Sequence, residues 1–369
     1  HLIFIVKIKN IMTVCILGNG LSGLTLAKAL VNENIYVDLL SPKKNLKLNK
    51  FRTIGISKSN SEFFCNNIIN IEKFLWKLNK IEIFTDNLKK EKLINFENKN
   101  DQLFSIVKNY KLHEYLEKCL SKNNYFKKKI FNKNSFFVDD YELVICCDYF
   151  HPITKKYFDK KILKQYNSIA YTTVIRHEKI LNNSAIQIFT KRGPLAFLPI
   201  SKNETSVVYS SDNSFSKKKV NINELIQFYN FKYKIKYIEK ISSFELNSLN
   251  LRSYHYDNIL AFGDLLHRIH PLAGQGFNMT IRDIKVLLEI IKKRKNLGLL
   301  LDSSVNNEFE NNLKHKNFIF SNGIDLIHEF FNIERKTKNS LLSKSAQLIA
   351  NNSSINKLFT KIADKGILF

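Results

Sequence analysis

The sequence contains Gly263-Asp-Leu-Leu-His-Arg-Ile-His-Pro-Leu-Ala-Gly-Gln-Gly-Phe-Asn278, which combines glycines and a proline with acidic, imidazole and amide side chains. The apolar run 258–262 leads into this stretch, and an amphipathic helix pattern over 279–291 leads out of it. The pattern predicts a strand, a polar turn and the start of a helix. Free N–H groups and the positive end of the helix dipole would then face a ligand in front of residues 274–278. Such a site suits a ligand that carries or develops negative charge.

A second glycine-bearing turn lies near the other end of the chain. Gly18, Gly20 and Gly23 have the G-x-G-x-x-G spacing of dinucleotide-binding turns. The apolar run 13–17 precedes this turn and a helix pattern over 21–32 follows it, as in the first unit of a parallel sheet. A ligand that touches both turns would carry a diphosphate at one end and an electron-accepting ring at the other. FAD fits that description, so we expect both turns to bind one FAD molecule.

The position that usually binds the adenosine ribose is not acidic in this chain. An acidic residue normally ends the second strand of such a unit, and by spacing that position is Ser41. Asp38 lies three residues earlier and on the other face of the strand. A serine hydroxyl lacks the charge-assisted hydrogen bond of a carboxylate, which contributes about 1.5–3 kcal/mol. We therefore expect Ser41 to contact the ribose and FAD to be retained less tightly than usual.

Composition excludes several classes of protein. The chain has 369 residues and is 44% hydrophobic, enough for two domains with real cores. Its net charge is +25, but the lysines are spread along the chain and no nucleic-acid-binding motif occurs, so we expect no nucleic-acid partner. Attraction to anionic lipid stays open. The five cysteines show no metal or disulfide spacing, which favours a reducing, cytoplasmic location and predicts no metal site. No apolar run approaches the ~20 residues of a membrane-spanning helix.

Hydrophobic periodicity predicts an α/β architecture in which two insertions interrupt the nucleotide-binding domain. We expect a Rossmann-like FAD/NAD(P)-binding domain with a parallel sheet from residues 12–70, 101–160 and 253–300. Short alternating strands predict an inserted antiparallel-sheet substrate domain from 71–100 and 161–252. Residues 301–369 are helical by pattern, and residues 1–11 are interpreted as an upstream extension before Met12. The segments 60–78 and 101–121 are each expected to form a helix.

The chain resembles the FAD-dependent aromatic hydroxylases of ubiquinone biosynthesis, within the flavoprotein monooxygenase group typified by p-hydroxybenzoate hydroxylase. The resemblance runs almost from end to end and rests on five stretches, 18–23, 52–57, 105–109, 193–199 and 263–283. The stretch 193–199 favours the ubiquinone branch of the group. The resemblance implies an enzyme that uses NADPH or NADH and O₂ to hydroxylate a polyprenyl phenol through a flavin hydroperoxide.

The resemblance also implies roles for individual residues. Arg52 would contact the FAD phosphates or ribityl chain, and Asp264 would accept a hydrogen bond from a ribityl hydroxyl. His270 and Pro271 would lie against the reacting face of the flavin, although His267 and His270 could instead be hydrogen-bonded turn residues without a role in proton transfer. The residues expected to line the flavin, partly through backbone N–H groups, are Gly274, Gln275, Gly276 and Asn278.

One motif departs from the family pattern. An Asp-Gly pair that contacts FAD and the nicotinamide nucleotide is here Asp148-Tyr149. A tyrosine penalises the left-handed backbone or close approach that glycine permits. The departure, together with Ser41, keeps open an alternative function, a flavin-fold scaffold or ligand-binding subunit of a ubiquinone biosynthesis complex.

Two further assignments are left open by the sequence. Leu195 and Phe197 could be walls of the substrate pocket or plain core. Near the C-terminus, an apolar row and a separate lysine row indicate either an interfacial helix at the cytoplasmic face of the inner membrane or a final helix packed on the core. The apolar row consists of Ile355, Leu358, Phe359 and Ile362, and the lysine row of Lys357, Lys361 and Lys365.

Overall fold

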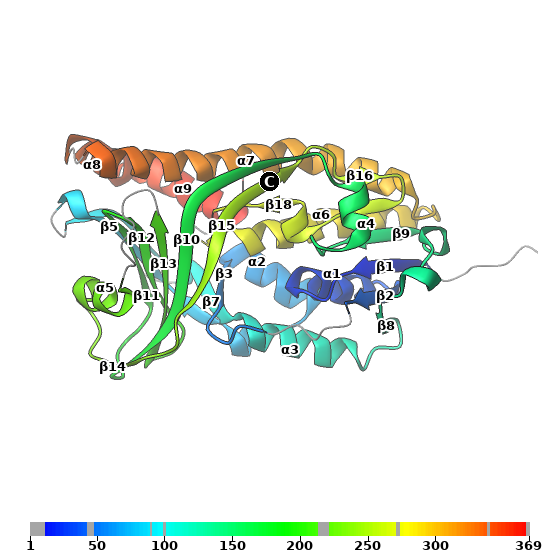
Figure 1. Cartoon of the computed structure of the whole chain (residues 1–369), viewed down its shortest axis with the longest axis horizontal. Coiled ribbons are helices and arrows are strands. Elements are labelled where there is room, and N and C mark those ends of the chain that lie inside the picture. The colour runs from blue at the N-terminus through cyan, green and yellow to red at the C-terminus, as the bar shows by residue number, and fades with distance from the viewer. Residues whose placement is uncertain are drawn as a thin grey trace, which may run out of the picture.

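The structure is a computed structural model that describes residues 12–42, 48–88, 91–98, 101–212, 221–270, 274–337 and 340–366. The proposed extension 1–11 and the predicted flavin-face residue Pro271 lie outside these ranges. Two lobes lie side by side, one built on a parallel sheet and one on an antiparallel sheet, and the long helix α7 runs along both (Figure 1).

The first lobe holds a 6-stranded sheet in the order β16-β17-β9-β1-β2-β8. All neighbouring strands are parallel except β16 and β17. The central strands are buried on both faces, which explains why their sequences are continuous apolar runs rather than alternating ones. The strands are β1 (Thr13–Leu17), β2 (Tyr36–Ser41), β8 (Phe126–Ile130), β9 (Leu143–Cys146), β16 (His255–Tyr256) and β17 (Ile259–Ala261). The associated helices are α1 (Leu21–Asn32), α3 (Asn109–Leu120), α4 (Pro152–Tyr157) and α6 (Gly276–Asn296).

The second lobe holds a 9-stranded sheet in the order β18-β15-β10-β13-β12-β11-β5-β6, with β14 paired to β10. Every pair is antiparallel except β11 with β5. Helix α5 (Ile222–Tyr229) packs on one face, and Leu195 and Phe197 are buried in that core, so they are not pocket walls. The strands are β5 (Lys80–Thr85), β6 (Lys92–Glu97), β10 (Lys161–His177), β11 (Ser184–Thr190), β12 (Gly193–Pro199), β13 (Glu204–Asp212), β14 (Ile235–Ile238), β15 (Ser242–Leu251) and β18 (His267–Arg268).

A 3-stranded sheet of β3 (Thr53–Ser57), β7 (Phe104–Lys108) and β4 (Trp76–Leu78) joins the lobes and corrects two predictions. The predicted helix 101–121 is a strand, β7, followed by α3. The predicted helix 60–78 ends early: α2 (Lys58–Phe63) continues as the π-helical η1 (Phe64–Ile68), and the chain then forms η2 (Glu72–Phe74) and β4. Short apolar runs have no decisive periodicity, and β7 is fixed by pairing with both β3 and β4.

The C-terminal region is helical, as the sequence predicts. It consists of α7 (Ser303–Thr337), α8 (Ser340–Asn351) and α9 (Ser353–Lys365). The remaining short helical turns are η3 (Asp86–Leu88), η4 (Lys133–Ser135), η5 (Val138–Asp140) and η7 (Gly263–Leu265). Among the helices in the described ranges, none is both long and apolar enough to cross a membrane. The predicted α/β class, with a parallel sheet, an antiparallel sheet and a helical C-terminus, is confirmed.

Candidate functional site

The first glycine turn has the geometry that its spacing predicts. Gly18 follows β1 with a φ of +114°, a conformation that penalises any side chain. A Cβ on Gly23 would lie 2.4 Å from the carbonyl oxygen of Gly18, so only glycine lets α1 pack this close to β1. A Cβ on Gly20, in contrast, would meet nothing within 4 Å. The middle glycine therefore presents bare backbone to open space at the N-terminus of α1, where a diphosphate would bind.

The second glycine turn lies directly against the first. A Cβ on Gly263, whose φ is +65°, would come within 2.7 Å of the Ser22 Cβ in α1. Asp264 is exposed although its neighbours Gly263 and Leu265 are buried. Its carboxylate forms no side-chain hydrogen bond or ion pair with the residues the structure describes, so it is available to a ligand. A Cβ on Gly276, the first residue of α6, would also meet nothing within 4 Å.

The start of α6 is held in place by internal hydrogen bonds of Asn278. Its Nδ2 donates to the carbonyl oxygens of Gly55 and Gly274, both at 3.1 Å. Its Oδ1 accepts from Ser57 N at 2.9 Å and from Asn60 Nδ2 at 3.1 Å. Asn278 is 0% exposed, and its side chain joins α6 to β3 and α2. Contact of its backbone with the flavin stays a prediction. The long-range partner on β3 explains why the spacing alone does not reveal this role.

Gln275 has a similar internal role, through Arg282. Arg282 donates from Nη2 to Gln275 Oε1 and from Nε to the carbonyl oxygen of Asn278, both at 3.1 Å. The guanidinium lies over the Phe320 ring, 4.6 Å from the ring centroid, and burial lowers the pKa of Arg282 to about 10. Both side chains are buried, so Gln275 can contact a ligand mainly through its backbone. Arg282 is a supporting residue that the sequence analysis missed, although a charge on an otherwise buried helix face was a usable signal.

A histidine on α3 supports the first turn and was also missed. His113 Nε2 lies 2.9 Å from the carbonyl oxygen of Asn19. A carbonyl only accepts, so Nε2 carries the proton and donates. Both residues are buried, and the contact fixes the carbonyl of Asn19 between Gly18 and Gly20. Nothing in the spacing of α3 indicates this contact, because the two residues are 94 positions apart.

Ser41 ends β2, where the ribose is expected, and Asp38 lies three residues earlier in the same strand. Asp38 is buried, and its Oδ2 accepts from Lys129 Nζ at 2.6 Å and from the Tyr141 hydroxyl at 2.8 Å. Asp38 is therefore a structural residue of the sheet, in agreement with its exclusion as the ribose partner. The Ser41 hydroxyl donates weakly to the carbonyl oxygen of Lys129 at 3.4 Å. Ribose binding by Ser41 stays a prediction.

The altered Asp148-Tyr149 pair lies next to the first turn. A Cβ on Gly18 would be 3.0 Å from the Asp148 Cβ, and Asp148 Oδ1 accepts from Phe150 N at 2.9 Å. Tyr149 does not have a positive φ, so its backbone needs no glycine. Its hydroxyl accepts from Lys161 Nζ at 2.6 Å. Left-handed backbone strain at Tyr149 is therefore absent. The effect of the tyrosine on the close approach of a cofactor, and the contact of Asp148 with it, stay predictions.

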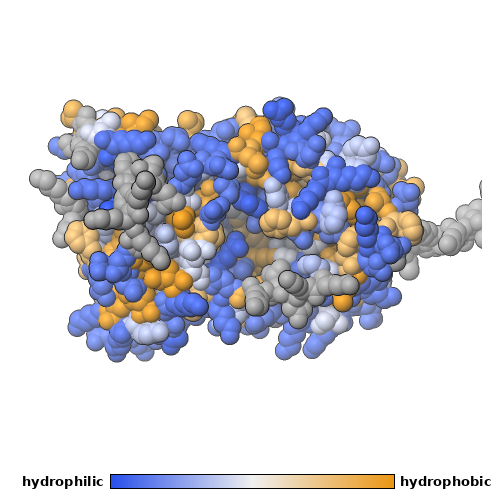
Figure 2. Space-filling model, viewed as in Figure 1, coloured by the Kyte–Doolittle hydropathy of each residue, from blue (hydrophilic) through white to orange (hydrophobic). Residues whose placement is uncertain are grey.

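Arg52 lies at the entrance to β3. Its side chain is exposed, and its carbonyl oxygen accepts from Asn109 N at 3.0 Å. The next residue, Thr53, donates from Oγ1 to Ser206 Oγ at 2.9 Å and so joins β3 to β13 of the other lobe. Arg52 therefore stands where the two lobes meet, and Figure 2 shows the surface hollowed between the lobes. Its contact with FAD stays a prediction.

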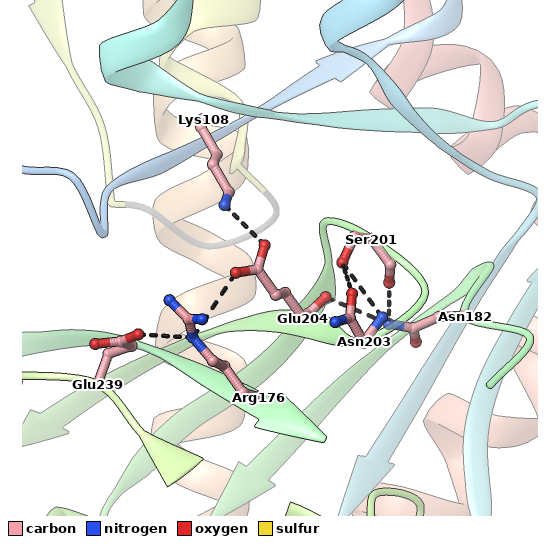
Figure 3. Close-up of polar contacts among 7 residues, drawn as sticks. All are labelled: Lys108, Arg176, Asn182, Ser201, Asn203, Glu204 and Glu239. Carbon is pink, nitrogen blue, oxygen red and sulfur yellow. Dashed lines mark hydrogen bonds and ion pairs between the residues drawn. The ribbon is translucent and has the colours of Figure 1, made fainter. Parts of the chain in front are cut away.

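A charge network ties β7 to the ends of β13 and β10 in the antiparallel sheet (Figure 3). Lys108 Nζ donates to Glu204 Oε2 at 2.8 Å, and the other oxygen of Glu204 lies 4.0 Å from Arg176 Nε. Arg176 Nε also donates to Glu239 at 2.8 Å. Lys108 belongs to the stretch 105–109 that carries the family resemblance, but its ammonium is paired with Glu204. Lys108 therefore connects the two lobes, and its ammonium is not free to bind a phosphate.

His270 is enclosed rather than open to the site. It is 1% exposed, and its ring centroid lies 4.3 Å from that of His328 on α7 and 4.9 Å from that of Tyr166 on β10. Burial lowers the pKa of His270 to about 3, and the neighbouring His328, Arg335 and Lys164 contribute in the same direction. The imidazole is therefore neutral at physiological pH. This packing favours the structural interpretation of His270 over a role on the flavin face, which stays untested.

The low pKa of His270 predicts acid sensitivity. An unfolded chain binds a proton at this histidine below about pH 6.5, whereas the folded protein binds it only near pH 3. The free energy of unfolding is therefore expected to fall by about 2 kcal/mol between pH 6.5 and pH 5 from this group alone. Urea denaturation across this range should show a shallower pH slope for His270→Gln than for the native protein. The exposed His315→Gln is the control, and an unchanged slope in His270→Gln would contradict the assignment.

The two glycine turns thus lie together, the first between β1 and α1 and the second between η7 and α6. The backbone of Gly20 and Gly276 and the carboxylate of Asp264 face open space. These residues fit FAD. Gly20 admits a diphosphate, Asp264 can accept from a ribityl hydroxyl, and the N-terminus of α6 stabilises negative charge on the ring system.

Comparison with known proteins agrees with this geometry. Residues 190–295 match a family model described as an FAD binding domain. The chain is 28% identical over 176 residues to 3-demethoxyubiquinol 3-hydroxylase of Escherichia coli (strain K12), covering 45% of this chain and 44% of that protein. It is 25% identical over 219 residues to a mitochondrial ubiquinone biosynthesis monooxygenase of Drosophila melanogaster, covering 49% and 46%. The matches span less than half the length of these relatives. The resemblance to the ubiquinone hydroxylases is nevertheless confirmed.

Solved structures show the same fold over almost the whole chain. The p-nitrophenol 4-monooxygenase of Pseudomonas putida superposes with a TM-score of 0.78 at 12% identity, covering 96% of this chain and 98% of that one. Klebsiella pneumoniae HpxO, solved with FAD and uric acid, gives 0.73 at 11% identity and covers 96% and 97%. At these identities the likeness establishes the fold of the flavoprotein monooxygenases and nothing finer.

Proposed function

We propose that this chain is an FAD-dependent monooxygenase that hydroxylates the aromatic ring of a polyprenyl phenol precursor of ubiquinone. The observation that carries the proposal is the contact between the two glycine turns, where Gly20 and Gly276 adjoin open space and Asp264 is exposed. The names of the sequence relatives support the substrate class. FAD, when bound, supplies the redox chemistry between NADPH or NADH, O₂ and the phenol.

The chain's own residues would bind and orient the cofactor. Backbone N–H groups at the start of α1 would bind the diphosphate, and Asp264 would fix the ribityl chain. The start of α6 would stabilise negative charge on the ring, because its N–H groups and dipole point outward there. Asn278 and Arg282 hold this helix end rigidly against β3 and α2, so the dipole is oriented before the ligand binds.

The visible spectrum of the purified chain tests this proposal. We expect flavin absorbance that is bleached by NADPH or NADH, followed by O₂ uptake that a prenylated phenol stimulates. Asp264→Asn should weaken FAD binding about tenfold, which corresponds to 1.4 kcal/mol. Asp257→Asn is the matched control, because Asp257 is exposed at the opposite end of β17. A colourless protein that binds the prenylated phenol but not FAD would instead support the scaffold function.

We further propose that α9 makes a peripheral contact with a membrane surface, where a polyprenyl substrate resides. Ile362 packs toward the core and the backbone carbonyl of Asp364 accepts from Ser57 Oγ at 2.8 Å, so one end of the helix is docked. Leu358 and Phe359 remain 55% and 43% exposed. The helix therefore combines a packed end with an exposed apolar pair, and it lies beside lysines that would attract anionic lipid.

Vesicle flotation tests the membrane contact. The chain is expected to float with vesicles that contain about 30% anionic phospholipid. Replacing both Leu358 and Phe359 with serine should weaken that binding about tenfold, because their exposed area no longer enters the interface. Leu181→Ser is the control, since Leu181 is 83% exposed and lies outside α9. Equal flotation of the double variant and the native chain would exclude α9 as the contact.

A further inference from the structure

Strand β11 turns a glutamine toward the first lobe, between two apolar clusters. Ile186 and Ile188 pack in the core under α5, so the alternating residues Ala185, Gln187 and Phe189 lie on the opposite face of the sheet. Ala185 packs with the three-stranded sheet, and the Phe189 ring is stacked on Phe331 of α7 with a centroid distance of 3.4 Å. Gln187, between them, is only partly buried although β11 is an inner strand. Its amide forms no hydrogen bond with any residue that the structure describes.

The strand register extends this position into a row across the sheet. Gln187 pairs with Ala196, Ala196 with Val208, and Val208 with Thr172, so these four residues share one face. We call them the central row. Ala196 and Val208 belong to none of the apolar clusters formed within the described ranges. Thr172 is only 5% exposed, and its Oγ1 has no hydrogen-bond partner among the described residues. A buried hydroxyl in this state is costly unless a ligand satisfies it.

The central row faces the second glycine turn. On one side of the row, the cluster with Ala185 includes Phe104, whose Cζ would lie 3.6 Å from a Cβ on Gly274. On the other side, the cluster with Phe189 includes Ile269 and Met279, which precede and follow that turn in the sequence. The row therefore lies between the two clusters that flank the start of α6, in the region where the surface is hollowed between the lobes (Figure 2). A ring lying on the row would point toward a flavin bound at the start of α6.

The surroundings of the central row carry no charge. The chain has 58 lysines and arginines, yet the segments 170–174, 185–189, 194–198 and 206–210 contain no charged residue. The buried Arg335 lies beyond them, beside Gly193 at the start of β12, and donates to the carbonyl oxygen of Phe331. A carboxylate placed on the row would lose its hydration without gaining a cation, which is strongly unfavourable. A neutral ring with hydroxyl or ether oxygens suits the row, because only an amide and a hydroxyl await partners there.

We propose that the central row binds the aromatic ring of a substrate that carries no carboxylate, with Gln187 and Thr172 as its polar contacts. This inference rests on the proposed function and specifies its substrate class. Gln187 can accept a phenol O–H through Oε1 and donate through Nε2 to a neighbouring ring oxygen. The Thr172 hydroxyl can donate to or accept from a third oxygen. Ala196 and Val208 provide a low apolar surface on which the ring can lie.

Two probes that differ only in charge test the selectivity. One is ortho-dimethylallylphenol, and the other is the same compound with a carboxylate para to the hydroxyl. Calorimetric titration of the purified FAD-loaded chain at neutral pH should show at least tenfold tighter binding of the neutral probe. Gln187→Arg should reduce or reverse this preference, because it places a guanidinium beside the carboxylate. Equal affinity of the native chain for the two probes would overturn the proposal.

Two nearly isosteric variants test the polar contacts. Gln187→Leu should weaken binding of the neutral probe about tenfold, the effect of losing a hydrogen bond to the ligand. Thr172→Val should also weaken it, while the free protein becomes no less stable, because the hydroxyl has no protein partner to lose. Gln227→Leu is the control, since Gln227 is exposed on α5, which covers the other face of the sheet.

The outcomes separate this inference from the proposed function. A flavin-containing chain that binds the neutral probe equally well in Gln187→Leu and Thr172→Val would overturn the inference and leave the proposed function standing. A chain that binds no FAD would contradict the proposed function. The same titrations on that FAD-free chain would still decide whether the central row binds the neutral ring, because calorimetry does not depend on the flavin.

Discussion

Gly20→Ala is expected to weaken FAD binding at least tenfold while the free energy of unfolding stays within about 0.5 kcal/mol of the native value. Gly20 precedes α1 with a φ of −70° and a ψ of 174°, a conformation that alanine adopts freely. The added methyl group would meet no protein atom within 4 Å. It would instead enter the space in which the diphosphate approaches the backbone. The expected loss is therefore confined to binding.

Gly23→Ala provides the matched contrast three residues later. Its methyl group would lie 2.4 Å from the carbonyl oxygen of Gly18, so α1 must move away from β1. We expect a loss of about 1–3 kcal/mol of stability together with the loss of FAD binding. Urea denaturation and quenching of flavin fluorescence measure the two effects separately. If Gly20→Ala binds FAD as tightly as the native chain, the diphosphate does not lie at this turn.

The parts of the site that the sequence predicts are those defined by local geometry. The spacing of Gly18, Gly20 and Gly23 between a strand and a helix requires one turn, and the structure has it. Asp264, to which the family resemblance assigns a ribityl contact, is exposed in the short stretch between β17 and α6. Each prediction depends on residues within about ten positions of one another, where backbone sterics restrict the conformation.

The parts that the sequence does not predict depend on distant partners. Asn278 resembles a ligand-binding amide until its bonds to Gly55 and Ser57, more than 200 positions away, are known. The strand at Phe104–Lys108 reads as the start of a helix because its two partner strands cannot be identified from its own residues. In both cases tertiary contacts, rather than local preference, decide the outcome.

Asp283→Ala is expected to lower the free energy of unfolding by about 3–5 kcal/mol, the largest effect on stability expected for a single residue of the site. Asp283 is 0% exposed and accepts from His267 Nε2 at 2.5 Å and from Asn317 Nδ2 at 3.1 Å. Alanine would leave both donors buried without an acceptor, and each unsatisfied group costs about 1–3 kcal/mol. The three side chains come from α6, β18 and α7, so the substitution loosens the framework behind the second glycine turn.

Two controls separate this structural effect from a direct effect on the cofactor. Asp283→Asn keeps one acceptor oxygen and should lose only part of the stability that alanine loses. Asp264→Asn, in the same motif but exposed, should change FAD affinity with almost no effect on unfolding. Chemical denaturation of the FAD-free proteins measures the first quantity, and FAD titration well below the denaturation midpoint measures the second. If Asp283→Ala has the same urea midpoint of unfolding as the native chain, the hydrogen bonds of Asp283 do not hold α6 to β18 and α7. The inference that the start of α6 is rigidly oriented would then lose its support.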